Sequence, residues 1–210
     1  MSFDYNFHVK KERPEDRIKD VREYFRNDTL LNYANSKNMK RIQEKITKRV
    51  LELLELADRD NLILDAGCGP GFASFYLKQE GYNLISLDLI TQFLNIYNMS
   101  EINPIAGDMT HLPFKPNTFD GIISISALQW IYQGINKLLD EKRMIKLVKS
   151  FYSVLKKNGI IIIQFYPKSL IALEEIGKIF VRYAPFEGGY IIDNQHNPKK
   201  RKIFLKLSKP

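Results

Sequence analysis

The order of apolar and polar segments is the feature that most limits the fold of this 210-residue chain. Short apolar segments typical of buried strands alternate with segments in which apolar residues recur every three or four positions, as in a helix that buries one face. The predicted strands are Leu62–Leu64, Leu84–Leu87, Ile102–Ala106, Gly121–Ile125 and Ile160–Phe165. The predicted helices are Asn38–Ala57, Phe72–Leu77, Thr91–Tyr97, Glu141–Lys156 and Leu170–Ala184. This alternation favours parallel strands joined by helices.

The last two apolar segments depart from the alternation. Tyr190–Ile192 and Ile203–Leu205 have no helical segment between them, which predicts an antiparallel hairpin. We therefore expect an α/β, Rossmann-like domain over residues 38–210, with a mostly parallel seven-stranded sheet, an antiparallel terminal hairpin and helices on both faces. Residues 1–37 are charge-dense with interspersed aromatic residues, and we expect them to form an arm or cover. Ligands of such sheets bind at the carboxyl ends of the strands.

The composition excludes several classes of protein. Cys68 is the only cysteine, so no internal disulfide can form, and three scattered histidines supply no metal-binding cluster. No apolar run reaches the roughly 20 residues that a membrane helix needs, and the N-terminus lacks the order of a signal peptide, so we expect a cytoplasmic protein. Lysine and arginine number 32 against 24 acidic residues, a formal charge of +8, which fits nucleic-acid binding but also occurs in proteins that bind no polyanion.

A glycine-rich turn follows the first predicted strand and precedes a helix. The turn contains Gly67, Cys68, Gly69 and Gly71, whose backbone can turn sharply and approach a ligand closely. The spacing is G-x-G-x-G, whereas nicotinamide sites have G-x-G-x-x-G. Asp65 ends the strand two residues before the first glycine, the pattern of S-adenosylmethionine enzymes. We expect its carboxylate to engage the amino-acid end of that cofactor.

Two further aspartates follow the next two predicted strands. Asp88, followed by Leu89, is placed to accept hydrogen bonds from the ribose hydroxyls of the cofactor. Asp108 is placed to bond the adenine amino group, while Met109 covers the ring. Each aspartate alone could equally be a helix N-cap or turn residue. Acids at three successive strand ends favour a shared ligand.

The segment after the fourth predicted strand limits which chemical group can accept the methyl group. Transfer from a sulfonium is an in-line displacement that mainly requires alignment. Methylation of a pyrimidine at carbon 5 needs a cysteine nucleophile, but Cys68 lies in the cofactor turn. Exocyclic amine methylation is associated with an Asn/Asp-Pro-Pro-Tyr/Phe element, whereas this chain reads Ser124–Trp130. Guanine N7 already presents a lone pair and needs only a stacking surface and hydrogen bonds to the edge of the base. Trp130 would stack on the base and Gln129 would bond its edge, while Ser126 would lie beside both the base and the cofactor. The alternative for Trp130 is a core or helix-cap residue.

Two linked segments carry a resemblance to a known family. Asp108–Gly121 and Ile123–Trp130 resemble the small-subunit ribosomal RNA (guanine-N7) methyltransferases, which are class I S-adenosylmethionine-dependent enzymes. Further similarity lies in Tyr24–Asn27, Ile42–Gln43, Arg49–Leu54, Gln164–Pro167 and Gly188–Asp193. The resemblance extends from about Asp20 to Leu207. Eukaryotic members continue into a long basic extension where this chain ends, at Pro210, so an archaeal relative is expected.

The resemblance implies an N7-methylguanine product in ribosomal RNA, S-adenosylmethionine as donor, and a small zinc-binding activator subunit in a heterodimer. It also implies that the strand near Ile102–Ala106 forms a sheet edge that accepts a strand of the activator. The alternative is an edge protected by the N-terminal arm. Basic clusters at Lys10, Lys11 and Arg13 and at Lys199–Lys202 would contact phosphates, or are simply solvated.

Three other functions stay open. One is a methyltransferase for a quinone or lipid precursor, because the Asp-Met-x-x-Leu-Pro-Phe element at Asp108–Phe114 is shared widely. Such an enzyme would have a deep apolar pocket, whereas an RNA enzyme would have a basic, open pocket mouth. Another is methylation of a different RNA such as tRNA. The third is a cofactor-binding assembly protein without catalysis.

Overall fold

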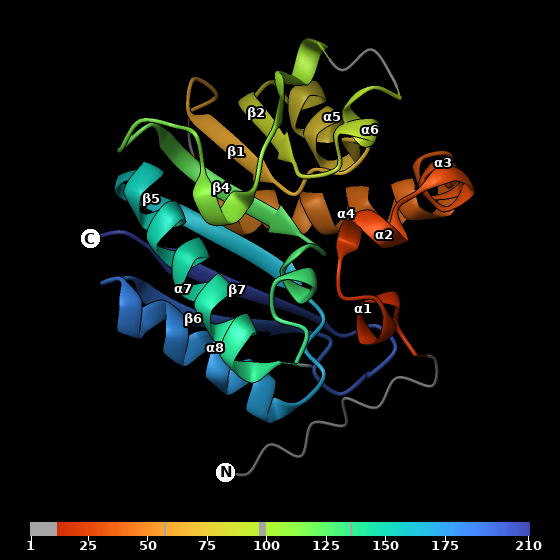
Figure 1. Cartoon of the computed structure of the whole chain (residues 1–210). Helices are drawn as coiled ribbons and strands as arrows, with labels where there is room; N and C mark the ends of the chain where they lie inside the picture. Colours follow the sequence, from red (N-terminus) through yellow and green to blue (C-terminus); the bar gives the residue numbers. More distant parts are fainter. Residues whose placement is uncertain (1–11, 57, 97–99, 135) are drawn as a thin grey trace.

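A computed structural model describes residues 12–56, 58–96, 100–134 and 136–210 of the chain. The core is one seven-stranded sheet with the order β3-β2-β1-β4-β5-β7-β6 (Figure 1). The strands are β1 Leu62–Ala66, β2 Asn83–Asp88, β3 Pro104–Ala106, β4 Phe119–Ile125, β5 Leu155–Phe165, β6 Glu187–Asp193 and β7 Lys202–Ser208. Strands β1 to β5 pair in parallel, while β7 is antiparallel to both β5 and β6. The predicted sheet and its terminal hairpin are confirmed, and β3 lies at one edge.

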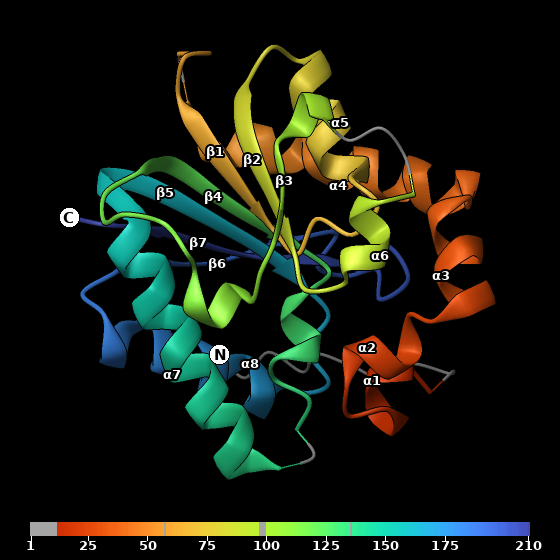
Figure 2. The same cartoon turned by 45° about the horizontal axis from the view of Figure 1, so that its top comes forward.

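Helices cover both faces of the sheet, as predicted. The main helices are α4 Lys37–Leu54, α5 Phe72–Gln79, α7 Lys137–Val154 and α8 Leu170–Tyr183, with a short α6 Thr91–Leu94. One core cluster joins α7 and α8 to the sheet through residues such as Phe151 and Phe180, and a second joins α4 and α5 through Val50 and Leu77. Figures 1 and 2 show the two helix pairs on opposite faces. Ser36, Asn136 and Ser169 cap α4, α7 and α8 by accepting backbone N–H bonds, which fixes where these helices begin.

Several predicted boundaries are wrong, and tertiary contacts explain them. The helix expected at Glu141–Lys156 begins at Lys137 and ends at Val154, because Leu155 already pairs with Phe119 of β4. The predicted strand Ile102–Ala106 starts only at Pro104. Ile102 belongs to a 3₁₀ turn, η1 Ser100–Ile102, and Asn103 has a left-handed φ of 48°. Helix α6 ends at Leu94, short of the expected Tyr97, which lies outside the described residues, as does Ala57.

The described part of the N-terminal segment forms three short helices, α1 Pro14–Arg17, α2 Val21–Tyr24 and α3 Asn27–Ala34. They lie at the end of the sheet toward which the arrows of β4 and β5 point (Figures 1 and 2). Leu30 and Ala34 of α3 pack with Ile90 and Phe93 near the end of β2. The segment therefore sits at the ligand-binding end of the sheet. Lys10 and Lys11 lie outside the described residues, and no helix in the described ranges is long and apolar enough to cross a membrane.

Candidate active site

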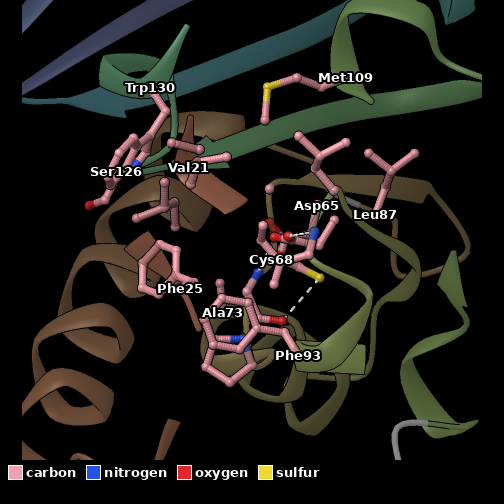
Figure 3. Close-up of a pocket in the computed structure, with 18 of the residues that line it drawn as sticks. Val21, Phe25, Asp65, Cys68, Ala73, Leu87, Phe93, Met109, Ser126 and Trp130 are labelled. Atoms are coloured by element: carbon pink, nitrogen blue, oxygen red, sulfur yellow. Dashed lines mark hydrogen bonds between the residues drawn. The ribbon is translucent and has the colours of Figure 1, made fainter. Parts of the chain in front are cut away.

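A cleft of about 910 Å³, partly open to solvent, lies at the carboxyl ends of β1, β2 and β4 (Figure 3). Such a size suits a small organic ligand. All of the site residues predicted from the sequence line this cleft except Gly71 and Gln129. They come from four separate segments of the chain, one at or after the end of each of the strands β1 to β4. The fold therefore brings together the three acids that the sequence places at strand ends.

Backbone hydrogen bonds attach the glycine-rich turn to β2, and the turn also packs closely against Ala127 and Met109. The N–H groups of Gly67 and Cys68 both donate to Leu87 O, at 2.7 and 3.1 Å. Gly67 has a φ of +85°, and a Cβ there would lie 2.7 Å from the Cβ of Ala127 and 2.8 Å from Cε of Met109. Gly71 is the N-cap of α5, also in the left-handed region. The turn thus needs glycine both for conformation and for close approach.

Asp65 is a buried carboxyl at the end of β1. Its Oδ2 accepts a hydrogen bond from Ser74 Oγ at 2.5 Å, and only 1% of the residue is exposed. Burial, with a smaller contribution from the charge of Asp88, raises the pKa of Asp65 to about 7 against the opposing hydrogen bond from the Ser74 hydroxyl. In the described ranges no lysine or arginine pairs with it. A ligand with a positively charged amino group would supply the missing charge.

Asp88 holds the glycine turn and faces the cleft. Its carboxylate accepts N–H bonds from Gly69 and Ile90, both at 2.7 Å. Burial raises the pKa of Asp88 to about 6, and these backbone bonds oppose the shift. Each carboxylate oxygen keeps a second lone pair, so the group can also accept hydrogen bonds from the hydroxyls of a ligand.

Asp108 caps the 3₁₀ turn η2, Met109–His111, by accepting the N–H of Thr110 at 2.8 Å. The N-cap that the sequence allowed as an alternative is therefore present, but Asp108 and Met109 also line the cleft. Cys68 is buried with its Sγ beside Gly69 O, and burial raises the pKa of the thiol well above its ordinary value. A neutral buried thiol is a poor nucleophile, in agreement with its exclusion from catalysis.

The turn after β4 presents Ser126 and Trp130 to the cleft. Ser126 has a left-handed φ of 57°, and its Oγ donates to Gln164 Oε1 at 2.9 Å. The ring of Trp130, in the 3₁₀ turn η3 Leu128–Trp130, lies 5.5 Å from the ring of Tyr24 and 6.0 Å from that of Phe25. Figure 3 shows Ser126 and Trp130 beside Val21 and Phe25. An aromatic ring and hydroxyl and amide groups thus form this wall.

Comparison with known proteins decides the family. A family model described as "Methyltransferase domain" matches residues 64–163. The chain is 36% identical over 189 residues to the 18S rRNA (guanine-N(7))-methyltransferase of Bos taurus, covering 88% of this chain and 67% of the relative. It is 31% identical over 193 residues to that of Schizosaccharomyces pombe, covering 88% and 70%. The chain belongs to the class I S-adenosylmethionine-dependent methyltransferases related to these enzymes.

The chain spans about two thirds of the length of these relatives. A putative S-adenosyl-L-methionine-dependent methyltransferase from Methanococcus maripaludis has the same fold, with a TM-score of 0.68 at 14% identity over 96% of this chain and 97% of that one. As a member of this family, the methyltransferase uses S-adenosylmethionine, and the lining of its cleft suits this cofactor. The uncompensated Asp65 carboxyl suits the cofactor's amino group, and the space left by the missing Cβ of Gly67 lets a ligand approach the turn.

Replacing Gly67 with alanine is expected to destabilise the methyltransferase by about 2–4 kcal/mol and to abolish measurable binding of S-adenosylhomocysteine. The new Cβ would combine left-handed strain with an overlap against Ala127, whose backbone-bound Cβ cannot move aside. Gly81→Ala is the matched control, because Gly81 has a φ of +87° but nothing within 4 Å of the added Cβ. Thermal unfolding and calorimetry measure both effects, and equal losses in the two variants would contradict the overlap.

Gln129, which the sequence predicts to bond the edge of the target base, does not line the cofactor cleft. It lines a second pocket on the other side of the turn, while its neighbour Trp130 lines the cofactor cleft. Gln129 Nε2 donates to Ser126 O at 2.9 Å, so the side chain also braces the turn. A 3₁₀ turn directs successive side chains to different sides, which the one-dimensional motif does not reveal.

Sequence reasoning missed the residues that close the cleft. Phe25, Tyr33 and Phe93 form an aromatic wall, and Arg143 of α7 lies at its border. Gln43 of α4 also lines the cleft and donates to Ser126 Oγ at 3.5 Å. The sequence indicated Tyr24–Asn27 and Ile42–Gln43 through the family resemblance, and Tyr24, Arg26 and Asn27 also as a cover for the cofactor, but it did not single out Phe93 or Arg143.

Proposed function

We propose that this methyltransferase transfers a methyl group to N7 of a guanine in RNA, with small-subunit ribosomal RNA as its substrate. The observation that carries the proposal is the wall after β4, where Trp130 lines the cleft together with the amide of Gln43 and the hydroxyl of Ser126. Guanine N7 needs a stacking face and no base to remove a proton. The names of the relatives support the same reaction.

The predicted site residues other than Gln129 each have a role in this proposal. Asp65 binds the amino group of the cofactor, and the backbone of the Gly67–Gly71 turn approaches the cofactor's amino-acid end. Asp88, beside Leu89, accepts the ribose hydroxyls, while Asp108 and Met109 hold the adenine. The bound cofactor supplies an already activated methyl group. Ser126 fixes the turn and Trp130 stacks on the guanine, so that the lone pair of N7 points at the methyl group.

The same proposal assigns residues 38–210 to one catalytic domain and residues 1–37 to its cover. The described part of the cover places Phe25 and Tyr33 in the cleft wall and packs α3 on Phe93. We place the enzyme in the cytoplasm, with the unpaired thiol of Cys68 as support.

The test is transfer of labelled methyl from S-adenosylmethionine to purified small-subunit RNA, with and without a small zinc-binding activator, followed by nucleoside analysis. Labelled N7-methylguanosine is the expected product. Label in another nucleoside, or cofactor binding without labelled RNA, would contradict the proposal. Label in transfer RNA alone would keep the chemistry but change the RNA.

A second candidate is an apolar small-molecule methyltransferase. The aromatic wall of Phe25, Tyr33 and Phe93 is the observation that favours it, because such a wall suits a greasy substrate. Extraction of the labelled reaction into an organic solvent distinguishes the two, since a quinone or lipid precursor carries its label into that phase while RNA does not.

We also propose that β3 pairs with a strand of the activator. Among the described strands β3 is bonded to β2 alone. Asn103 O and Gly107 N bond to β2, so the backbone groups of Ala106, which alternate with them, face outward. An unpaired edge of this kind is a template for an added strand.

Ala106→Pro is expected to abolish co-purification with the activator, because it removes the outward N–H that a partner strand would bond. Ala106→Gly keeps this N–H and is expected to retain the complex. Size-exclusion chromatography of the co-expressed proteins measures both variants, and binding of S-adenosylhomocysteine reports whether each has folded. A wild-type chain that is soluble, monodisperse and fully active alone would contradict the heterodimer.

A further inference from the structure

A second pocket, with an empty volume of about 770 Å³, lies beside the cofactor cleft. The turn η3 separates the two, with Trp130 on the cleft side and Gln129 on the pocket side. Consecutive Cα atoms are about 3.8 Å apart, so the two cavities flank a single turn of the backbone. The pocket also lies at the carboxyl end of β5, through Phe165 and Tyr166. The pocket is therefore adjacent to the place proposed for the target base at Trp130.

The walls of the pocket suit a flat, partly polar ring. Tyr132, Phe165, Tyr166 and Pro167 supply aromatic and apolar surface. Gln129 contributes a carbonyl oxygen, Oε1, that is buried and has no hydrogen-bond partner among the described residues. Its orientation is fixed, because Nε2 of the same amide donates to Ser126 O. A buried acceptor without a partner is costly, and an N–H group of a ligand would satisfy it.

Positive charge borders this pocket at Tyr166. Cζ of Arg13, in the N-terminal segment, lies 5.7 Å from the centre of the Tyr166 ring, and Nζ of Lys202, at the start of β7, lies 5.3 Å from the same centre. Figure 1 shows α1, which follows Arg13, beside the loop that leads into β7. Lys168 and Lys137 of the pocket are neutralised by Asp16 and Glu175.

Neither of the two cations at Tyr166 has a carboxylate within ion-pair distance in the described part of the chain. Arg13 and Lys202 come from the ends of the two basic clusters of the sequence, which the fold brings to one ring. The surplus charge suits a phosphate.

We propose that this pocket binds the base of the nucleotide adjacent to the target guanine. This inference rests on the proposed RNA substrate. The base stacks against Tyr166 and donates an N–H to Gln129 Oε1, while the neighbouring phosphate contacts Arg13 and Lys202. Single-stranded RNA is commonly held in this way, by aromatic stacking beside a basic groove. Occupation of both pockets would fix the guanine in register with the methyl donor.

The test uses the full chain and fluorescein-labelled RNA heptamers with a central guanosine flanked by adenosines. One heptamer is intact, and two carry an abasic residue directly 5′ or 3′ to the guanosine. Stacking of one base is worth about 5- to 150-fold in affinity, so one abasic heptamer is expected to bind the wild type that much more weakly. Tyr166→Leu is expected to bind the intact and abasic heptamers within twofold of each other.

Tyr152→Leu is the matched control, because Tyr152 is also a half-buried tyrosine under a cation, with Lys209 Nζ 4.4 Å from its ring, but lies in the C-terminal half of α7. Tyr152→Leu is expected to show the same loss of affinity for the abasic heptamer as the wild type, and Tyr166→Phe is expected to show most of that loss. Equal abasic losses in the wild type and Tyr166→Leu, no abasic loss in the wild type, or no heptamer binding would each overturn the inference.

Failure of the proposed function is read separately, from nucleoside analysis. Heptamer binding with the expected abasic loss but no N7-methylguanosine in any small-subunit RNA overturns the reaction and leaves the pocket supported. N7-methylguanosine without an abasic loss overturns the pocket and leaves the reaction supported.

Discussion

Replacing Asp88 with asparagine is expected to weaken the binding of S-adenosylhomocysteine by about 100-fold or more, because hydrogen bonds to a charged group contribute about 1.5–3 kcal/mol each. The Asp88 carboxylate accepts the N–H groups of Gly69 and Ile90, one on each oxygen. An asparagine has one acceptor oxygen, so its NH₂ group would face one of these donors. The variant would therefore loosen the glycine turn and lose the charge proposed to bind both ribose hydroxyls.

Asp140→Asn is the matched control for this substitution. Asp140 is also buried, and its Oδ2 accepts the N–H of Gly134 at 2.6 Å, but it does not line the cofactor cleft. Its variant is expected to lose stability while its affinity for S-adenosylhomocysteine stays within threefold of the wild type. Isothermal titration calorimetry measures the affinities, and thermal unfolding the stabilities. Equal affinity of the wild type and Asp88→Asn would remove Asp88 from the cofactor site.

The same titrations are expected to depend on pH. Burial raises the pKa of Asp65 to about 7 and that of Asp88 to about 6, from an ordinary value of 3.8. Between pH 3.8 and about 7 the folded protein without cofactor therefore binds more protons than the unfolded chain. These two groups thus lower the free energy of unfolding as the pH rises through this range. The proposed cofactor contacts require both carboxylates to be ionised, so the affinity is expected to rise between pH 5 and pH 8 with release of protons. Asp88→Asn should lack the part of this rise near pH 6.

The sheet and the acids of the site could be predicted because they depend on local pattern. Strand and helix periods are short-range features, and parallel strands present their carboxyl ends on one edge, so Asp65, Asp88 and Asp108 had to converge once the strands were recognised. Trp130 was placed at the cleft for the same reason, since it lies in the turn that follows the end of β4.

What the sequence could not reveal depends on contacts between distant segments. Leu155 looks like the continuation of a helix, yet it pairs with Phe119 across the sheet. Tyr33 reaches the cleft only because α3 folds back over the end of β2. Arg13 and Lys202 are 189 positions apart and meet at Tyr166 through packing alone. Sequence periodicity carries no information about contacts between such distant segments. The cover of the cleft and the second pocket could therefore not be predicted from the sequence.

The second large effect is expected at Trp130. Trp130→Leu should lower kcat/KM for methyl transfer to RNA by about 100-fold, because base stacking contributes about 1–3 kcal/mol and misalignment of the guanine costs further rate. The affinity for S-adenosylhomocysteine should change less than about fivefold, since the proposed cofactor contacts come from Asp65, Asp88 and Asp108. Trp130→Phe keeps an aromatic face and should stay within about tenfold of the wild type.

The alternative that Trp130 is only a packing residue makes a different prediction. Its ring contacts Tyr24 and Phe25 of the N-terminal cover, so a packing role would lower the thermal stability and the cofactor affinity together in Trp130→Leu. If Trp130 stacks on the base, Trp130→Leu lowers kcat/KM for transfer to RNA but retains the affinity for S-adenosylhomocysteine. Rescue by phenylalanine sharpens the distinction, since it restores a face for the base but fills less of the space of the indole. Transfer to RNA by Trp130→Leu at the wild-type rate would exclude Trp130 from base binding and leave packing against the N-terminal cover as its role.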